Sequence, residues 1–268
     1  GEKLSVEGGW EAAVGLTERW LARAERVDTL LEGLAASLTG QERARAQQLF
    51  YGVVRWSSRL EAALAGLMAH APRTKVRAIL MVAAFELLEQ KDADPAAREG
   101  LVAKIIHHAV GKAKTVASAK EAGLVNAVAR KLVPRLFGDD GRAADSGDAA
   151  VLAERWAHPE WLVARWIRQF GAGPTRQLLE WNQQPAPVYA RWRSADPVPE
   201  HLAPTRWPGF FEVKAGRWDE VRRLATEGKL YLQDPSTRLC IDLIAPQPDE
   251  IVLDACAAPG GKSLFIAD

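Results

Sequence analysis

The part of this chain that most constrains its fold is a ten-residue segment, Asp254-Ala255-Cys256-Ala257-Ala258-Pro259-Gly260-Gly261-Lys262-Ser263. It follows a short apolar run, Ile251-Val252-Leu253, and precedes residues that favour a helix from about Lys262. A buried strand, a tight turn of small residues and the start of a helix are the parts of a Rossmann-type nucleotide site. Glycines allow the backbone to approach a ligand closely, and Ala257 and Ala258 keep the floor of the loop free of bulk. The segment therefore predicts a ligand-binding loop at the start of an α/β sheet.

Two kinds of ligand fit such a loop, and the spacing of its residues separates them. A phosphate-binding P-loop has the spacing G-x-x-x-x-G-K-[ST] and turns backbone N–H groups toward the phosphates. Gly261-Lys262-Ser263 supplies the end of that pattern, but Cys256 occupies the position of its first glycine. Pro259 has no N–H to donate. The spacing therefore argues against a P-loop, which an ATP-binding assay would detect.

Composition indicates an ordinary globular protein. The residues are 48% hydrophobic and 26% charged, as in soluble globular proteins. A length of 268 residues is enough for two domains and a fraction of a third. No apolar run approaches the roughly 18–20 residues of a membrane span, and Gly1-Glu2-Lys3 does not begin a signal peptide. Two cysteines, Cys240 and Cys256, build neither a disulfide framework nor a zinc site, and Cys240 is expected to be buried and inert. We therefore expect a cytoplasmic protein without a metal site.

The region from Trp10 to about Phe137 is predicted to be helical almost throughout, because its apolar residues recur at spacings of three and four. The expected helices cover about 10–24, 29–38, 41–69, 76–85, 95–108 and 122–136, with a basic segment containing Lys112 and Lys114 before the last. The helix at 41–69 should bend or break around Trp56. The helix at 76–85 is apolar nearly all round and should be the buried centre of this region.

A second region should follow a polar, glycine-bearing linker at 139–148. Its expected helices are 149–156, 159–170, 174–182 and 217–228, and its expected strands are 188–193, 210–213 and 230–232. Strands that alternate with helices indicate an α/β layer. Asp234 followed by Pro235 predicts a helix N-terminus without chemistry. Five tryptophans fit apolar helical faces and are expected mostly in the core: Trp10, Trp20, Trp161, Trp166 and Trp181.

Several stretches carry a resemblance to a known family. The segment 254–263 resembles the first S-adenosylmethionine-binding motif of RNA cytosine-5 methyltransferases of the Nol1/Nop2/Sun family, Sun/Fmu type. The stretches 158–163 and 233–237 resemble segments of the same family, in which the position of Arg193 usually carries Asn. The first region resembles the NusB-like all-α RNA-binding domain through residues 47–56, 77–80 and 123–130.

The resemblance implies a fold class and a domain order. The fold would be a mainly α, NusB-like helical domain, then a small α/β domain, then the start of a Rossmann-type methyltransferase fold. The implied segments are a NusB-like domain at 1–138, a linker at 139–148, a pre-methyltransferase domain at 149–233 and the beginning of the methyltransferase domain at 234–268.

The resemblance also implies a function, which is methylation of cytosine C5 in small-subunit ribosomal RNA by a monomer. S-adenosylmethionine would be held by the cofactor loop, whose expected binding residues are Cys256, Ala257, Ala258, Pro259, Gly260, Gly261 and Lys262. Asp254 is expected to fix the loop by accepting backbone hydrogen bonds. The catalytic cysteines are expected beyond Asp268, so that the 268 residues alone would be an inactive fragment. The alternative is a non-catalytic NusB-like RNA-binding module.

RNA binding would need a local cluster of cations, because 35 Lys and Arg nearly balance 34 Asp and Glu. The candidates for a phosphate-binding patch are Arg55, Arg59, Arg73, Lys75, Arg77, Lys112 and Lys114. The same residues could equally form a solvated face, and the sequence leaves both alternatives open.

Overall fold

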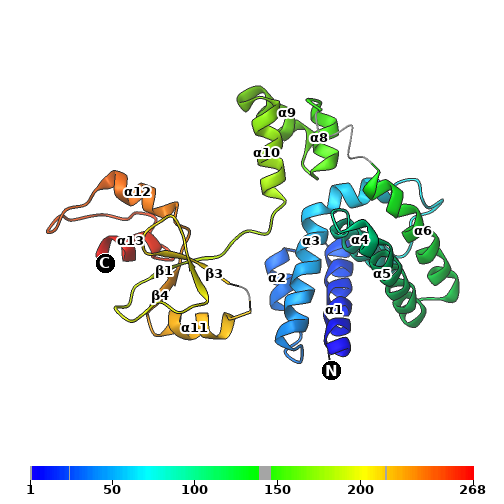
Figure 1. Ribbon diagram of the computed structural model, residues 1–268, viewed down its shortest axis with the longest axis horizontal. Coiled ribbons are helices and arrows are strands. Elements are labelled where there is room, and N and C mark those ends of the chain that lie inside the picture. Colours follow the sequence, from blue (N-terminus) through cyan, green and yellow to red (C-terminus); the bar gives the residue numbers. More distant parts are fainter. Residues whose placement is uncertain (1, 24, 139–145, 215) are drawn as a thin grey trace. The chain divides into compact units, whose positions relative to one another are not determined.

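The computed structural model describes residues 2–23, 25–138, 146–214 and 216–268 (Figure 1). The chain forms two compact units, Gly1–Gln184 and Pro185–Asp268. Most of the predicted linker at 139–148 lies outside the described residues. The predicted division into four segments remains a prediction, since compactness divides the chain once, after Gln184. None of the helices described is both long and apolar enough to cross a membrane.

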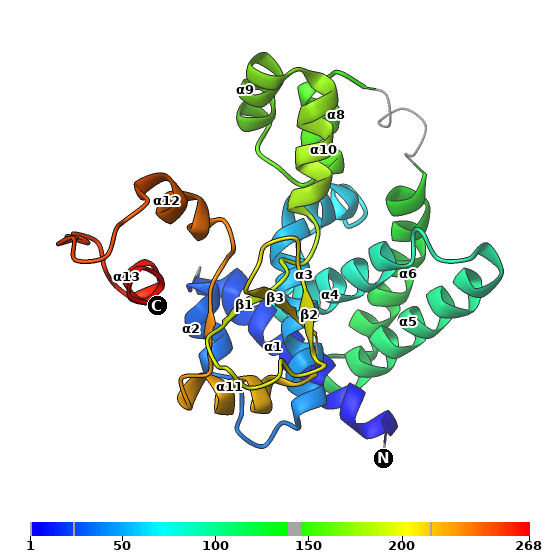
Figure 2. The ribbon, with the colours of Figure 1, turned by 60° about the vertical axis from the view of Figure 1, so that its left-hand side comes forward.

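The first unit begins with a bundle of helices. These are α1 (Glu2–Arg23), α2 (Val27–Glu32), α3 (Gly40–Leu64), α4 (Thr74–Glu89), α5 (Pro95–Val116) and α6 (Ala119–Phe137). Both ribbon views show α4 lying among α1, α3, α5 and α6, as predicted for the central helix (Figures 1 and 2). Its residues from Ala78 to Leu88 are all buried. Gly52 of α3 permits this close packing, because a Cβ there would collide with the ring of Phe85.

Local sequence signals set the helix boundaries of the bundle. Thr39 and Glu42 form a capping box at the start of α3, and Ser118 and Glu121 form one at the start of α6. Each box satisfies backbone N–H groups that the first helical turn would otherwise leave unpaired. The one buried acid of α4, Glu86, accepts hydrogen bonds from Trp10 Nε1 at 2.8 Å and from Arg45.

Some predicted helix limits differ from those observed. The helix predicted at 29–38 is α2 and already ends at Glu32. Helix α3 continues as helix through Trp56, so the predicted break is absent there, and Leu60 continues the buried stripe. The predicted bend at Trp56 remains a prediction. Helix α5 extends past the predicted end at 108 through the basic segment to Val116. Ala113 is buried there, and Lys112 pairs with Glu11 of α1 at 2.6 Å, so this segment packs as helix rather than forming a connection.

The first unit ends in a smaller helical group at positions close to those predicted. It comprises α8 (Ala149–Arg155), α9 (Glu160–Phe170) and α10 (Ala172–Asn182), around the buried side chains of Leu152, Val163 and Leu179. Helices α9 and α10 pack against each other as a hairpin that turns at Gly171, whose φ is 85°. Glycine adopts this backbone conformation without the strain that a side chain would cause.

The second unit contains a small antiparallel sheet. Its strands are β1 (Tyr189–Trp192), β2 (Leu202–Pro204), β3 (Phe210–Val213) and β4 (Leu230–Leu232), in the order β2-β3-β1-β4. Helix α11 (Trp218–Thr226) contributes Val221 and Leu224 to its core. Helices α12 (Thr237–Ile244) and α13 (Gly261–Ala267) follow. Strand β2 was not predicted, since it is only three residues long and includes a proline.

The predicted strand at Ile251-Val252-Leu253 does not form. Ile251 is fully exposed and Leu253 is 88% exposed. A strand needs a neighbouring strand to pair its backbone groups, and the sheet of this unit uses β1 to β4 alone. The start of a Rossmann sheet is therefore not formed among the described residues.

Candidate functional site

The candidate loop is held in shape by the side chain of Asp254. Its Oδ1 accepts a hydrogen bond from the backbone N–H of Cys256 at 3.1 Å, and its Oδ2 accepts one from Ser263 Oγ at 2.7 Å. The carboxylate thus joins the beginning of the loop to the first turn of α13. The expectation that Asp254 fixes the loop is confirmed, because both of its oxygens are engaged within the loop itself.

The loop borders an open hollow with a volume of about 220 Å³. One side is the loop, and the other comes from β4 and the start of α12. The lining residues are Tyr231, Leu232, Gln233, Asp234, Thr237, Asp254, Cys256, Ala257, Ala258, Pro259, Gly261 and Lys262. All the predicted binding residues except Gly260 therefore line one hollow. Gly260 adopts a φ of 104°, which an alanine would adopt only with strain, and so lets the chain turn into α13.

Two residues of the hollow that sequence reasoning assigned no role hold the loop against the sheet. Tyr231 Oη donates to the carbonyl of Pro259 at 3.2 Å, and Gln233 Nε2 donates to the carbonyl of Gly261 at 2.9 Å. A Cβ at Gly261 would lie 3.1 Å from Tyr231 Cε1 and 3.3 Å from Gln233 Nε2. A side chain at 261 would therefore be tight against both residues, and glycine allows the close approach without any shift. The only sequence signal was the position of Gln233 beside Asp234 in a stretch that resembles the family.

Behind Gln233 lies a buried arginine of β1. Arg191 is 5% exposed and donates from Nε to Gln233 Oε1 at 3.1 Å and from Nη1 to Asp268 Oδ2 at 2.6 Å. Its guanidinium also lies 4.7 Å from the ring centre of Phe265 in α13. Arg191 thus connects β1 with α13 directly and with the loop through Gln233.

Arg193 completes this connection. It binds the two carboxylate oxygens of Asp268 at 2.6 and 2.7 Å in a bidentate arrangement. The hydrogen bonds from Arg193, supported by Arg191, lower the pKa of Asp268 to about 2. The arginine that stands where the family usually has asparagine therefore fastens α13 to the sheet.

The two cysteines and Asp234 differ in part from expectation. Cys256 is exposed and lines the hollow, whereas Cys240 is exposed and not buried as predicted. Cys240 lies on the open side of α12, whose one buried residue is Ile241. Helix α12 begins at Thr237, so Asp234 is not its N-cap; its Oδ1 accepts from the N–H of Ser236 at 2.7 Å in a turn before the helix. Within the described residues, no three His, Cys, Asp or Glu side chains are grouped to hold a metal ion.

Most of the predicted cation patch is engaged inside the first unit. Arg73 binds Glu121 through two contacts of 2.6 Å, Arg77 pairs with Glu61, and Lys112 pairs with Glu11. The hydrogen bonds from Arg73 and from the Ser118 cap lower the pKa of Glu121 to about 2. Three candidates make no ion pair with any described residue: Arg55, Lys75 and Lys114.

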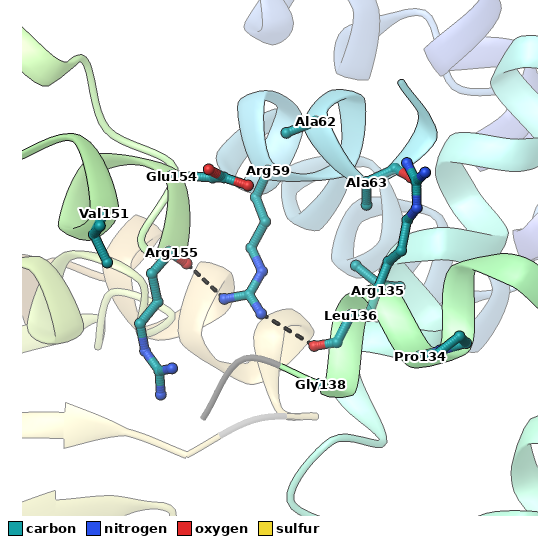
Figure 3. Close-up of a pocket in the computed structure, with 10 residues that line it drawn as sticks. All are labelled: Arg59, Ala62, Ala63, Pro134, Arg135, Leu136, Gly138, Val151, Glu154 and Arg155. Atoms are coloured by element: carbon teal, nitrogen blue, oxygen red, sulfur yellow. Dashed lines mark hydrogen bonds between the residues drawn. The ribbon is translucent and has the colours of Figure 1, made fainter. Parts of the chain in front are cut away.

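Arg59, the seventh candidate, is buried and structural. Figure 3 shows its guanidinium between two helix ends, donating to the carbonyl of Leu136 at 3.1 Å and to that of Arg155 at 2.6 Å. Arg135 donates to the carbonyls of Ala63 and Ala65 at the end of α3. Unpaired carbonyls at the ends of three helices are satisfied in this way, beside a cavity of about 490 Å³. Arg59 therefore joins α3 to α6 and α8, and does not belong to a phosphate-binding surface.

Fold and site together define a class of protein with an N-terminal all-helical domain and a loop of small residues beside an open hollow. Residues 11–134 match the NusB family, so the predicted helical domain is confirmed. The crystal structure of PH0851 has the same fold, with a TM-score of 0.58 over 97% of this chain and 60% of that one, at 16% identity.

Curated relatives narrow the resemblance further. The chain is 30% identical over 263 residues to ribosomal RNA small subunit methyltransferase B of Serratia proteamaculans, covering 92% of this chain and 58% of that protein. It is 28% identical over 275 residues to the protein of the same name from Cronobacter sakazakii, covering 94% and 58%. The predicted resemblance is therefore confirmed, and the chain spans 58% of the length of these relatives.

Proposed function

We propose that this chain is the RNA-binding and cofactor-binding part of an enzyme that transfers a methyl group from S-adenosylmethionine to a cytosine C5 of small-subunit ribosomal RNA. The observation that carries the proposal is the loop 254–263, which combines the family's motif with an open hollow. The NusB match at 11–134 and the name of the relatives support RNA as the substrate. The proposal covers the activity of the whole protein to which such a chain would contribute.

The loop fits the cofactor in its shape and in the groups it offers. Small side chains at Ala257 and Ala258 leave the backbone accessible, and Gly260 has open space where a Cβ would stand. Asp254 is committed to Cys256 and Ser263, so we assign it to shaping the loop and not to the ligand. S-adenosylmethionine would be held along Cys256 to Lys262 and would supply an electrophilic methyl group when bound.

The size of the hollow limits how tightly these 268 residues alone would bind the cofactor. Pockets for ligands of this size hold roughly 300–1,000 Å³, whereas this hollow holds about 220 Å³. The acidic residue that grips a ribose in Rossmann folds follows a second strand of the sheet, which is not formed among the residues that the structure describes. We therefore propose that the 268-residue chain binds the cofactor weakly and does not transfer the methyl group by itself.

The family resemblance implies covalent chemistry at the cytosine. A cysteine thiolate adds to C6, the electron-rich C5 takes the methyl group, a base removes the C5 proton, and the thiolate leaves. Neither cysteine of this chain is assigned this role. Cys256 lies within the cofactor loop itself, and Cys240 lies on α12 and does not line the hollow. The nucleophile is therefore expected outside residues 1–268.

The alternative is a NusB-like RNA-binding module without catalysis. It is favoured by the complete helical core of α1 to α6, compared with the exposed apolar segment at 251–253. The two functions differ in whether the loop must bind a cofactor. They can be separated by an assay that changes the loop and leaves the helical domain untouched.

The test is methyl transfer from labelled S-adenosylmethionine to unmodified small-subunit ribosomal RNA by the full product of the gene. Gly260→Ala strains the loop, because φ is 104° there, and is expected to lower transfer at least about tenfold. Gly209→Ala is the matched control, since Gly209 also has a positive φ of 80° and open space around it but lies outside the hollow. Transfer that is absent from the wild type, or equally affected by both variants, would count against the proposal.

A further inference from the structure

Two tryptophans that were expected in the core lie at the surface of the first unit. Trp161 at the start of α9 is 67% exposed, and Trp181 at the end of α10 is 66% exposed. Both belong to the same end of the α9–α10 hairpin, because Asn182 Nδ2 lies 3.2 Å from His158 Nε2 there. Large aromatic side chains that are exposed at the same end of a helix pair indicate an interaction surface more than isolated ones do.

Two arginines extend this surface along α9. Arg165 and Arg168 follow Trp161 by four and seven positions, which places the three side chains on one helical face about 10 Å long. Both arginines are exposed, and neither makes an ion pair with any described residue. In contrast, Arg73 and Arg77 of the same unit are each paired with a glutamate.

The same face is not needed to fold the hairpin. The opposite side of α9 carries the packing, with Val163 buried and Trp166 and Ile167 partly buried in the core of this group. Trp166 also meets the ring of His158 edge to face at 6.0 Å. Trp161, Arg165 and Arg168 can therefore be changed without disturbing the core.

We propose that the α9 face, defined as Trp161, Arg165 and Arg168, binds single-stranded RNA together with Trp181. Tryptophan rings accept stacked bases, and guanidinium groups bind the phosphates between them. An apolar protein partner fits this face less well, because it would bury two arginines without partners for their charges. Glu160 and Glu180 precede Trp161 and Trp181 by one position each, and carry negative charge. Each is turned about 100° around its helix from its tryptophan, so it does not share the tryptophan's face.

The inference rests on the proposed function for the identity of the partner, since RNA is the substrate class proposed for the whole protein. It adds a location that neither the loop nor the NusB match supplies, because residues 160–182 lie outside both. Binding at this face does not require the cofactor, so it can be measured separately from methyl transfer.

The test is fluorescence anisotropy of a labelled single-stranded RNA of about 12 nucleotides, a length within the usual site size, titrated with the 268-residue chain. Trp161→Ala is expected to weaken binding at least about fivefold through the lost stacking. The double variant Arg165→Gln/Arg168→Gln is expected to weaken it and to reduce the slope of log K against log salt by about 1.4, or roughly 0.7 per lost phosphate contact.

The matched control is Trp218→Ala/Arg217→Gln in the second unit, which removes an exposed tryptophan and an exposed arginine elsewhere. It should leave binding within about twofold of the wild type, and circular dichroism should show all variants folded. Absence of RNA binding by the wild-type chain would overturn the inference. RNA binding that stays unchanged in the α9-face variants would also overturn it. The same holds if these variants weaken only a contact with another protein segment and not RNA binding. Methyl transfer that fails while these RNA results hold would count against the proposed function alone.

Discussion

Helix α4 and the segment 251–253 are both uninterrupted apolar runs, yet their surroundings are opposite. Ala78 to Phe85 are buried on every side by α1, α3, α5 and α6. Ile251 and Leu253 are exposed, and none of the described strands of the second unit pairs with them. The difference teaches that an apolar run becomes a buried element only when other segments cover it. The first region carries its cover within residues 10–137, whereas the described residues around 251–253 offer none.

The largest expected effect concerns stability. Leu80→Ala removes a fully buried side chain from α4 and should lower the free energy of unfolding by about 2–5 kcal/mol. Leu253→Ala should change it by less than about 0.5 kcal/mol, because this side chain is exposed in the folded chain. Urea unfolding followed by circular dichroism measures both. Similar losses for the two variants would show that the segment 251–253 is covered after all.

A smaller effect is expected where polar contacts, rather than a core, hold the loop. Gln233→Ala leaves the Gly261 carbonyl and Arg191 Nε without their partner, at a cost of about 1–3 kcal/mol. Hydrogen exchange of the amides in 254–263 should therefore speed up, while exchange in α4 stays unchanged. Gln247→Ala is the matched control, because this exposed glutamine bonds only within its own loop. Equal exchange rates of the 254–263 amides in the two variants would show that Gln233 does not support the loop.

The attachment of α13 through Asp268 should depend on pH. Arg193 and Arg191 lower the pKa of Asp268 from its usual 3.8 to about 2 in the folded chain. Because the folded pKa is the lower one, the stabilisation is complete above about pH 4 and is lost as pH falls toward 2. The order of α13 can be monitored through the NMR signals of its backbone amides. Asp268→Asn should abolish the pH dependence of these signals. An unchanged acid profile in the variant would mean that the ion pair does not anchor the helix.

The smallest effect is expected at the cysteines. Cys240→Ser and Cys256→Ser should each change the free energy of unfolding by less than about 0.5 kcal/mol, because both side chains are exposed. Both thiols should also react with a thiol reagent under native conditions. A slow reaction at Cys240 would instead indicate that this side chain is buried, as its apolar neighbours in the sequence predicted.

Sequence periodicity predicted the parts of the fold that depend on local pattern. The central position of α4, the helices α8 to α10 and three of the four strands follow from it. The turn at 254–263 followed from its small residues, and the role of Asp254 from its place before that turn. These features depend on residues that are close together in the chain.

What the sequence could not predict depends on contacts between distant residues. Gln233 and Gly261 meet across 28 positions, and Arg191 and Asp268 across 77. The exposure of Trp161 was missed for a related reason, since an apolar face predicts burial only if a partner surface exists. The ion pairs within the candidate cation patch could not be predicted either, because the sequence does not reveal that Glu121 lies beside Arg73.

The most direct test of the central claim is to find where the cofactor binds. Labelled S-adenosylmethionine would be crosslinked by ultraviolet light to the full product of the gene, and the labelled peptide would be identified by mass spectrometry. Our account predicts label in the peptide that contains residues 254–263, reduced by Gly260→Ala and retained in Gly209→Ala. Label confined to a peptide outside 230–263, or equal labelling of both glycine variants, would contradict it.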